Sequence, residues 1–135
     1  MVTITVIALM ASVTLWALPR PGGRVADEAQ RFALRVKAAR DGAVVAARPT
    51  SLWVTAGGYG FDQRVAGRWV PAADLRVERW AEGTRVEPGD SSGRVRVVFD
   101  TTGLPDRGAD VRLQRGGRAM LVRVGADGSV RADAQ

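Results

Sequence analysis

The sequence predicts an α+β fold, in which a long N-terminal helix packs on a small antiparallel β-sheet domain. Three observations predict it. Residues 1–18 form one uncharged apolar run, and residues 24–48 place apolar side chains at every third or fourth position. Residues 49–135 contain short runs of alternating apolar and polar side chains, separated by glycine-containing turns. These patterns are typical of a membrane-length helix, an amphipathic helix and β-strands.

The first 18 residues are predicted to form a helix that crosses a membrane once. A membrane helix needs about 20 apolar residues, and this run is close to that length. It lacks the basic start of a cleavable signal peptide, and Trp16 suits the membrane–water interface. The side chains expected to lie in the bilayer, or to pack on neighbouring helices, are Val2, Ile4, Val6, Ile7, Leu9, Met10, Val13, Leu15, Trp16 and Leu18.

Residues 19–23 contain two prolines and two glycines, and are expected to kink or break the helix before a second, amphipathic helix over residues 24–48. Asp27 and Glu28 are expected in its first turn, where acidic residues complement the helix dipole. Arg48-Pro49 ends the segment. The apolar side chains expected to pack the helix on the β domain are Val25, Ala29, Phe32, Val36, Ala39 and Ala43.

Residues 49–135 are predicted to form about seven to nine antiparallel strands. Residues 51–56 and 59–64 flank Gly57-Gly58 and form a predicted hairpin, as do residues 111–113 and 119–124 around Gly116-Gly117. The run 94–99 alternates, so that Val95, Val97 and Phe99 share one face. Residues 129–131 form a short last strand, after which the tail is expected to fray.

The composition excludes several classes of chemistry. The chain of 135 residues contains no cysteine and no histidine, which excludes disulfides, thiol or imidazole catalysis and the common zinc sites. We therefore expect no enzymatic activity, no cofactor and no metal site. The formal net charge is +6, and of 20 basic residues only Lys37 is a lysine. Because the arginines are interleaved with acidic residues, we interpret them as a solvated basic surface rather than a polyanion site.

Three groups of residues could have either a ligand-binding role or a structural role. For each group we favour the structural role. The glycine-rich stretch 57–61 is interpreted as a turn rather than a phosphate loop, since no Gly-Lys-Ser/Thr follows. Aspartates in a loop rich in glycine and proline usually form turns rather than bind cations. We interpret the three aspartates that follow residue 99 in this way; they are Asp100, Asp106 and Asp110. The tryptophans are expected to pack in the core or an interface rather than stack on a base or sugar, and they are Trp53, Trp69 and Trp80.

The order of these segments resembles that of type IV pilin-like proteins. Within that superfamily it is similar to the H-type minor pseudopilins of type II secretion (general secretion pathway protein H, the GspH/FimT family). The stretches that carry the resemblance are MVTITVIALMASVTLWALP, DEAQRFALRVKAARDGAVVAARP, SLWVTAGGYGFDQRVAGRWVPA and VRVVFDTTGLPDRGADVRLQRGGRAMLVRVGADGSV. They resemble the family's hydrophobic helix, its Ala- and Arg-rich helix, its first hairpins and its C-terminal strands.

The resemblance implies a structural subunit near the tip of the type II secretion pseudopilus, which supports protein export across the outer membrane. The implied partners are the minor I, J and K pseudopilins, the major pseudopilin, the inner-membrane assembly platform and, for the full-length form, prepilin peptidase, which cleaves and methylates prepilins. The resemblance places residues 1–18 in the bacterial inner membrane and the C-terminal domain in the periplasm. We expect no nucleic-acid partner.

Two alternatives stay open. The first is a FimT-like minor pilin of a type IV pilus that binds DNA during uptake. Gly93-Arg94-Val95-Arg96 resembles a Gly-Arg-x-Arg element associated with DNA binding in such pilins, which makes Arg94 and Arg96 candidate polyanion contacts. Alternation along the strand alone would also place both arginines on a solvated face. The second alternative is an unrelated membrane-tethered β domain.

The sequence departs from the family at its start. The family's short basic leader, its glycine and its Phe-Thr-Leu-Leu-Glu-like motif are not among these residues. Arg20 and Arg24 follow the apolar run, and the positive-inside rule would then leave the C-terminal domain in the cytoplasm. We expect Met1 to be an internal residue of a longer prepilin, whose basic leader would restore a periplasmic C-terminal domain.

Overall fold

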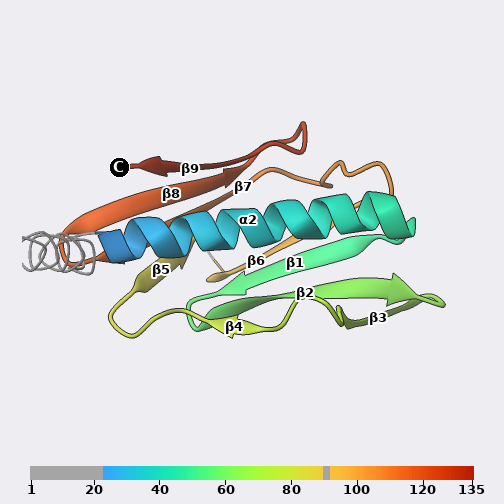
Figure 1. Ribbon diagram of the computed structural model, residues 1–135, viewed down its shortest axis with the longest axis horizontal. Helices are drawn as coiled ribbons and strands as arrows, with labels where there is room; N and C mark the ends of the chain where they lie inside the picture. Colours follow the sequence, from blue (N-terminus) through green and yellow to red (C-terminus); the bar gives the residue numbers. More distant parts are fainter. Residues whose placement is uncertain (1–22, 90–91) are drawn as a thin grey trace, which may run out of the picture.

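The computed structural model describes residues 23–89 and 92–135, in which one long helix lies across two antiparallel β-sheets (Figure 1). This arrangement confirms the predicted α+β class. The predictions for residues 1–18 and for residues 19–22 of the expected kink lie outside the described residues. Within the described ranges, no helix has the length and apolar character needed to cross a bilayer.

The helix, α2, runs from Gly23 to Ala46. Gly23, expected in the kink, is already helical. Because the helix starts there, its first turn contains no acidic residue, and the prediction that Asp27 and Glu28 lie in that turn is wrong. The helix ends before the predicted residue 48 because Ala47 adopts a left-handed backbone, with φ of 52°. The next amide, of Arg48, donates to the carbonyl of Ala43 at 3.1 Å, which satisfies one of the last helical acceptors.

The strands form two sheets. The first has the order β3-β2-β1-β6, with β4 also paired to β2. Its strands are β1 (Thr50–Thr55), β2 (Gly58–Val65), β3 (Arg68–Pro71), β4 (Glu78–Arg79) and β6 (Arg94–Phe99). The second has the order β5-β7-β8-β9. Its strands are β5 (Arg85–Pro88), β7 (Ala109–Arg115), β8 (Arg118–Val124) and β9 (Val130–Ala134).

Both predicted hairpins are present, as β1–β2 and β7–β8. Two details differ from the prediction. The tail does not fray, because β9 pairs with β8 as far as Ala134, opposite Met120, and the amide of Gln135 donates to the carbonyl of Ala119 at 3.0 Å. The two-residue strand β4 was not predicted, since two residues carry no alternation pattern.

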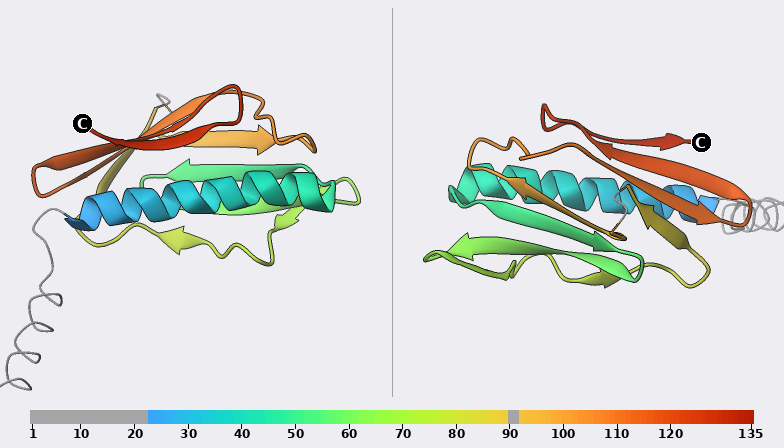
Figure 2. Two further views of the ribbon diagram at one scale, coloured as in Figure 1. Left: turned by 45° about the horizontal axis from the view of Figure 1, so that its top comes forward. Right: turned by 180° about the vertical axis from the view of Figure 1, so that it is seen from behind.

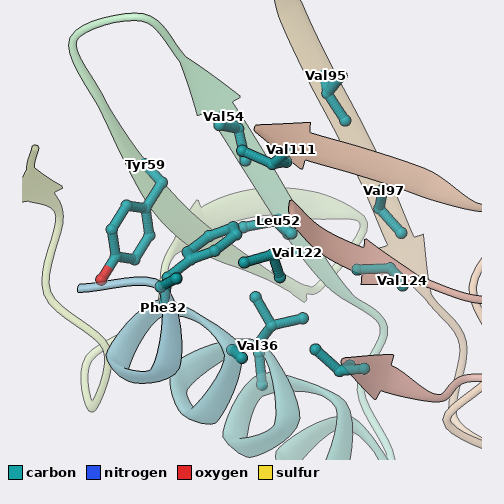
Figure 3. Packing of buried hydrophobic residues seen from close by; sticks show 14 of the residues in the cluster. Phe32, Val36, Leu52, Val54, Tyr59, Val95, Val97, Val111, Val122 and Val124 are labelled. Carbon is teal, nitrogen blue, oxygen red and sulfur yellow. The ribbon is translucent and has the colours of Figure 1, made fainter. Parts of the chain in front are cut away.

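The core lies between α2 and the inner faces of both sheets (Figure 3). All six helix residues expected to face the β domain are at most 2 % exposed. Phe32 and Val36 point toward Leu52 and Val54 of β1 and Val122 of β8 (Figure 3). The helix contacts β1, β7, β8 and β9. The helix therefore joins the two sheets. In the part of the chain that the structure describes, no other element covers the outer faces of these sheets (Figure 2).

Candidate functional site

The helix presents an exposed surface on the side away from the sheets. We call Leu34, Ala38, Asp41 and Val45 the open ridge; successive members are four, three and four residues apart, which aligns them along one face of α2. Leu34 is 62 % exposed and Val45 is 88 % exposed. Large apolar side chains this exposed, aligned on one helix, form a surface suited to packing against another helix.

The outer face of the first sheet carries a second group of side chains, the outer-face cluster, which consists of Trp53, Asp62, Trp69, Arg94 and Arg96. Strand alternation places them opposite the core, because Val95, Val97 and Phe99 of β6 are buried beneath. Arg94, Arg96 and Trp53 line a surface groove of about 310 Å³ together with Thr55. The two arginines named as candidate polyanion contacts are therefore adjacent to an indole ring.

Arg96 crosses the sheet rather than pointing freely into solvent. Its Nε donates to Ser51 Oγ at 2.9 Å, and its Nη2 lies 3.7 Å from Asp62 Oδ2. Its guanidinium also lies 5.2 Å from the centre of the Trp69 ring. The ion pair is partly exposed, so its contribution to stability is small. These contacts nevertheless hold Arg96 in one position, whereas Arg94 has no ion pair within the described residues.

The three tryptophans have different environments. Trp80 is buried, with its ring 5.2 Å from that of Phe32 and 4.7 Å from that of Tyr59, and its Nε1 donates to the carbonyl of Thr55 at 2.9 Å. Trp53 and Trp69 are half-buried on the outer face. The indole of Trp53 lies directly over Gly60, where a Cβ would overlap it. The prediction of core packing is therefore confirmed for Trp80, whereas Trp53 and Trp69 belong to the outer-face cluster.

Polar side chains of α2 hold the loop that contains β4. Glu28 accepts from the amide of Ala81 and from the hydroxyl of Thr84, both at 2.6 Å. Arg35 lies 3.3 Å from Glu78 Oε1 and donates to the Tyr59 hydroxyl at 3.3 Å. Burial raises the pKa of that hydroxyl, and the nearby Arg35 opposes the rise. Sequence reasoning missed these contacts, since partners 24 to 56 residues apart leave no local signal.

The aspartates have separate roles within the described residues. Asp100 accepts from the Thr102 hydroxyl and from the amides of Leu104 and Thr102 at 3.0 and 2.9 Å, and these hydrogen bonds lower its pKa. Asp106 accepts from the amide of Val98 at 2.9 Å, and Asp110 pairs with Arg123 at 3.0 Å. No cluster of acidic side chains in the described ranges has the makeup of a metal site. The glycine stretch 57–61 continues from the β1–β2 turn into β2.

This arrangement, a long helix laid across antiparallel strands with one face left open, is that of a pilin-like protein. The minor pseudopilin EpsH from the type 2 secretion system of Vibrio cholerae has a similar structure, with a TM-score of 0.70 and 14% identity over 82% of this chain and 97% of EpsH. The type IV minor pilin FimU of Pseudomonas aeruginosa has a TM-score of 0.66 and 12% identity, over 84% of this chain and 93% of FimU. At these identities the similarity shows the fold alone.

The family is shown by sequence. The family model of the type II transport protein GspH matches residues 28–128, which is most of the chain. The chain belongs to the GspH family, whose members are structural, membrane-anchored pseudopilins of type II secretion that associate with other pseudopilins. Among curated protein sequences, none matches this chain.

Proposed function

We propose that the protein is a non-enzymatic minor pseudopilin that takes its place at or near the tip of the type II secretion pseudopilus and supports protein export across the outer membrane. The observation that carries this proposal is the match of residues 28–128 to the GspH family. The open ridge supports it, because a filament subunit needs helix surface that its own β domain does not cover.

The open ridge supplies an interface with the next subunit. Burying an exposed leucine or valine side chain contributes about 1.5–3 kcal/mol to association, and Leu34 and Val45 are both largely exposed. Asp41 lies between them; its carboxylate is 3.1 Å from Arg40 Nε but stays largely exposed, so its charge can still contribute to the choice of a basic partner. The neighbours we propose are the minor I, J and K pseudopilins and the major pseudopilin, delivered by the inner-membrane assembly platform after prepilin peptidase has processed and methylated the full-length form.

The proposed location follows from the apolar start of the chain. Residues 1–18 carry no charge and anchor the protein in the bacterial inner membrane as a single pass. The residues after Pro19 then lie in the periplasm. In the assembled filament, the same apolar residues, Val2 to Leu18, exchange lipid contacts for contacts with the helices of neighbouring subunits.

Cross-linking in cells tests this proposal, because the chain has no native cysteine. Leu34→Cys and Val45→Cys, each expressed with cysteine-substituted partner pseudopilins, are expected to give disulfide-linked pairs. Arg131→Cys, exposed on the outer face of β9, is the matched control and is expected to give none. Equal adducts from the control, or no adduct with any pseudopilin from either helix position, would contradict the proposed assembly.

A second candidate function is DNA binding by a type IV pilus minor pilin. The specific observation that favours it is the outer-face cluster, since two neighbouring arginines beside half-buried indoles suit both phosphate contact and base stacking. A mobility-shift assay with the full chain and duplex DNA distinguishes the two functions. The secretion function predicts no salt-sensitive shift. A shift that disappears in Arg94→Ala/Arg96→Ala and persists in Arg107→Ala/Arg131→Ala would favour DNA binding.

A further inference from the structure

Five arginines gather at the end of the molecule where α2 begins. We call Arg24, Arg85, Arg112, Arg115 and Arg118 the basic end. The tip of the β7–β8 hairpin and the first turn of α2 line one surface depression of about 480 Å³, which includes Val25, Ala26 and Arg118. An adjoining depression of about 480 Å³ is lined by Arg85, Arg112, Arg115 and Arg118. Figure 1 shows the hairpin tip and the start of α2 at the same end of the fold.

The hairpin brings two positive charges into register. Gly116 and Gly117 both have positive φ, 57° and 77°, which is the backbone of a tight two-residue turn. Arg115 and Arg118 are consequently direct cross-strand partners. Partners in this position have Cβ atoms about 4.5–5.5 Å apart, and like charges there destabilise a hairpin. The turn thus maintains an unfavourable pair that a bound anion would relieve.

Within the described residues, the arginines of this surface outnumber the acidic side chains near them. None of the five arginines forms an ion pair in the part of the chain that the structure describes. Glu87 lies opposite Arg112 in the strand register, and Glu82 is exposed in the turn before β5. Glu28 accepts hydrogen bonds from Ala81 and Thr84, and Asp27 is exposed one helical turn after Arg24. Arg115 lies over Gly83, with its Nε 3.8 Å from where a Cβ would stand, so the β4–β5 turn holds this arginine beside the others.

The position of the basic end indicates which anion it meets. Six residue steps separate Leu18, the last residue of the apolar run, from Arg24, and a polypeptide spans at most about 20 Å over six steps. If residues 1–18 lie in the bilayer, the basic end cannot be far from its headgroups. Basic clusters next to a membrane anchor are attracted to anionic lipids over about one Debye length, roughly 8–10 Å.

We propose that the basic end docks on anionic phospholipid headgroups and orients the β domain on the membrane surface before the subunit enters a filament. This inference rests on the proposed membrane anchoring by residues 1–18. Arg115 and Arg118 would share one phosphate, while Arg24, Arg85 and Arg112 contribute longer-range attraction. Entry into a filament would then require release of these contacts, which makes docking a reversible resting state of the anchored subunit.

Spin-labelled lipids test the inference with the full chain reconstituted in vesicles. A fluorophore on Gln114→Cys, in the basic depression, reports contact with headgroup-labelled lipid, and one on Ala126→Cys, in the β8–β9 turn, is the control. Quenching at position 114 is expected to be stronger in phosphatidylcholine mixed with phosphatidylglycerol than in phosphatidylcholine alone. It should weaken at high salt, and position 126 should not respond.

Two kinds of variant separate docking from folding. Arg115→Gln/Arg118→Gln should reduce the docking equilibrium about fivefold per arginine, whereas Arg48→Gln/Arg107→Gln, with the same loss of charge at the other end, should not. Arg118→Glu replaces a like-charged pair by an opposite one. It should therefore raise the Tm by a few degrees while it weakens docking by about 25-fold. If Arg118 had only a structural role, Arg118→Glu would not raise the Tm and weaken docking at the same time.

Each outcome decides between defined alternatives. Flotation with neutral vesicles tests the anchoring by itself, and a chain that does not float overturns both the anchoring and the inference that depends on it. A chain that floats with neutral vesicles, but whose label at position 114 does not respond to phosphatidylglycerol, overturns the inference alone. Loss of the phosphatidylglycerol-dependent quenching at position 114 on addition of a short DNA duplex, with the same dependence on Arg115 and Arg118, would assign the surface to nucleic acid instead.

Discussion

A single glycine in β2 determines where the Trp53 ring lies. The indole covers Gly60, and a Cβ at that position would overlap it. We expect Gly60→Ala to destabilise the fold by about 1–3 kcal/mol, because the ring or the strand must move. Gly42→Ala is the matched control, since nothing lies within 4 Å of its added Cβ; it should stabilise the helix by about 0.4–1 kcal/mol. Urea unfolding measures both, and changes of equal sign would contradict this account.

Asp100 makes the stability of the β6–β7 turn depend on pH. Hydrogen bonds from Thr102 and Leu104 lower its pKa in the folded protein. The stabilisation is therefore present above the ordinary aspartate pKa of about 3.9 and is lost as pH falls through the lower folded value. We expect Asp100→Asn to be less stable than the parent at pH 6 and the difference to shrink toward pH 2. Thermal unfolding across this range measures the effect.

The control for this pH prediction is Asp74→Asn, in the exposed loop between β3 and β4. Because this side chain is exposed, its replacement should change the free energy of unfolding at pH 6 by less than about 0.5 kcal/mol. A parent–variant difference at Asp100 that grows toward acid would contradict the sign derived above.

At the scale of elements, α2 holds the loop before β5 through one carboxylate. Glu28 accepts two hydrogen bonds of 2.6 Å, from Ala81 and Thr84. Hydrogen bonds to charged groups contribute about 1.5–3 kcal/mol when well made, and less when partly exposed. We expect Glu28→Ala to cost about 1–2 kcal/mol and to speed hydrogen exchange at Ala81. Asp27→Ala, the exposed neighbour on the helix, should change neither quantity.

At the scale of the whole molecule, the two faces of α2 have separate roles. Phe32 is fully buried between the rings of Tyr59 and Trp80, so Phe32→Ala should cost about 3–5 kcal/mol. That is a large part of the 5–15 kcal/mol that typically stabilises a domain. Leu34→Ala, on the open ridge, should change stability by less than about 0.5 kcal/mol but weaken association with other pseudopilins.

Thermal melts and partner co-purification together test this division of roles. Loss of partner association in Leu34→Ala, with an unchanged melt, would assign the ridge to assembly. A destabilised Leu34→Ala variant would show instead that the ridge contributes to folding, and would weaken the proposed function.

The sequence by itself determined the features that repeat along the chain. The helical period identified Phe32, Val36 and their neighbours as the buried face, and alternation separated Val95 and Val97 from Arg94 and Arg96. Gly116-Gly117 marked a hairpin because only glycine readily adopts two successive positive φ values. These signals are local, since each depends on residues within a few positions of one another.

Only the tertiary structure decided which distant side chains meet. It separated Trp80, packed on Phe32, from Trp53 and Trp69 on the outer face, and it paired Glu28 with Thr84. It also brought the Arg115–Arg118 hairpin tip to the start of α2. The physical reason is that such contacts depend on how the sheets are ordered and how the helix crosses them. Those choices are made by packing the whole core, and no single segment of the sequence contains them.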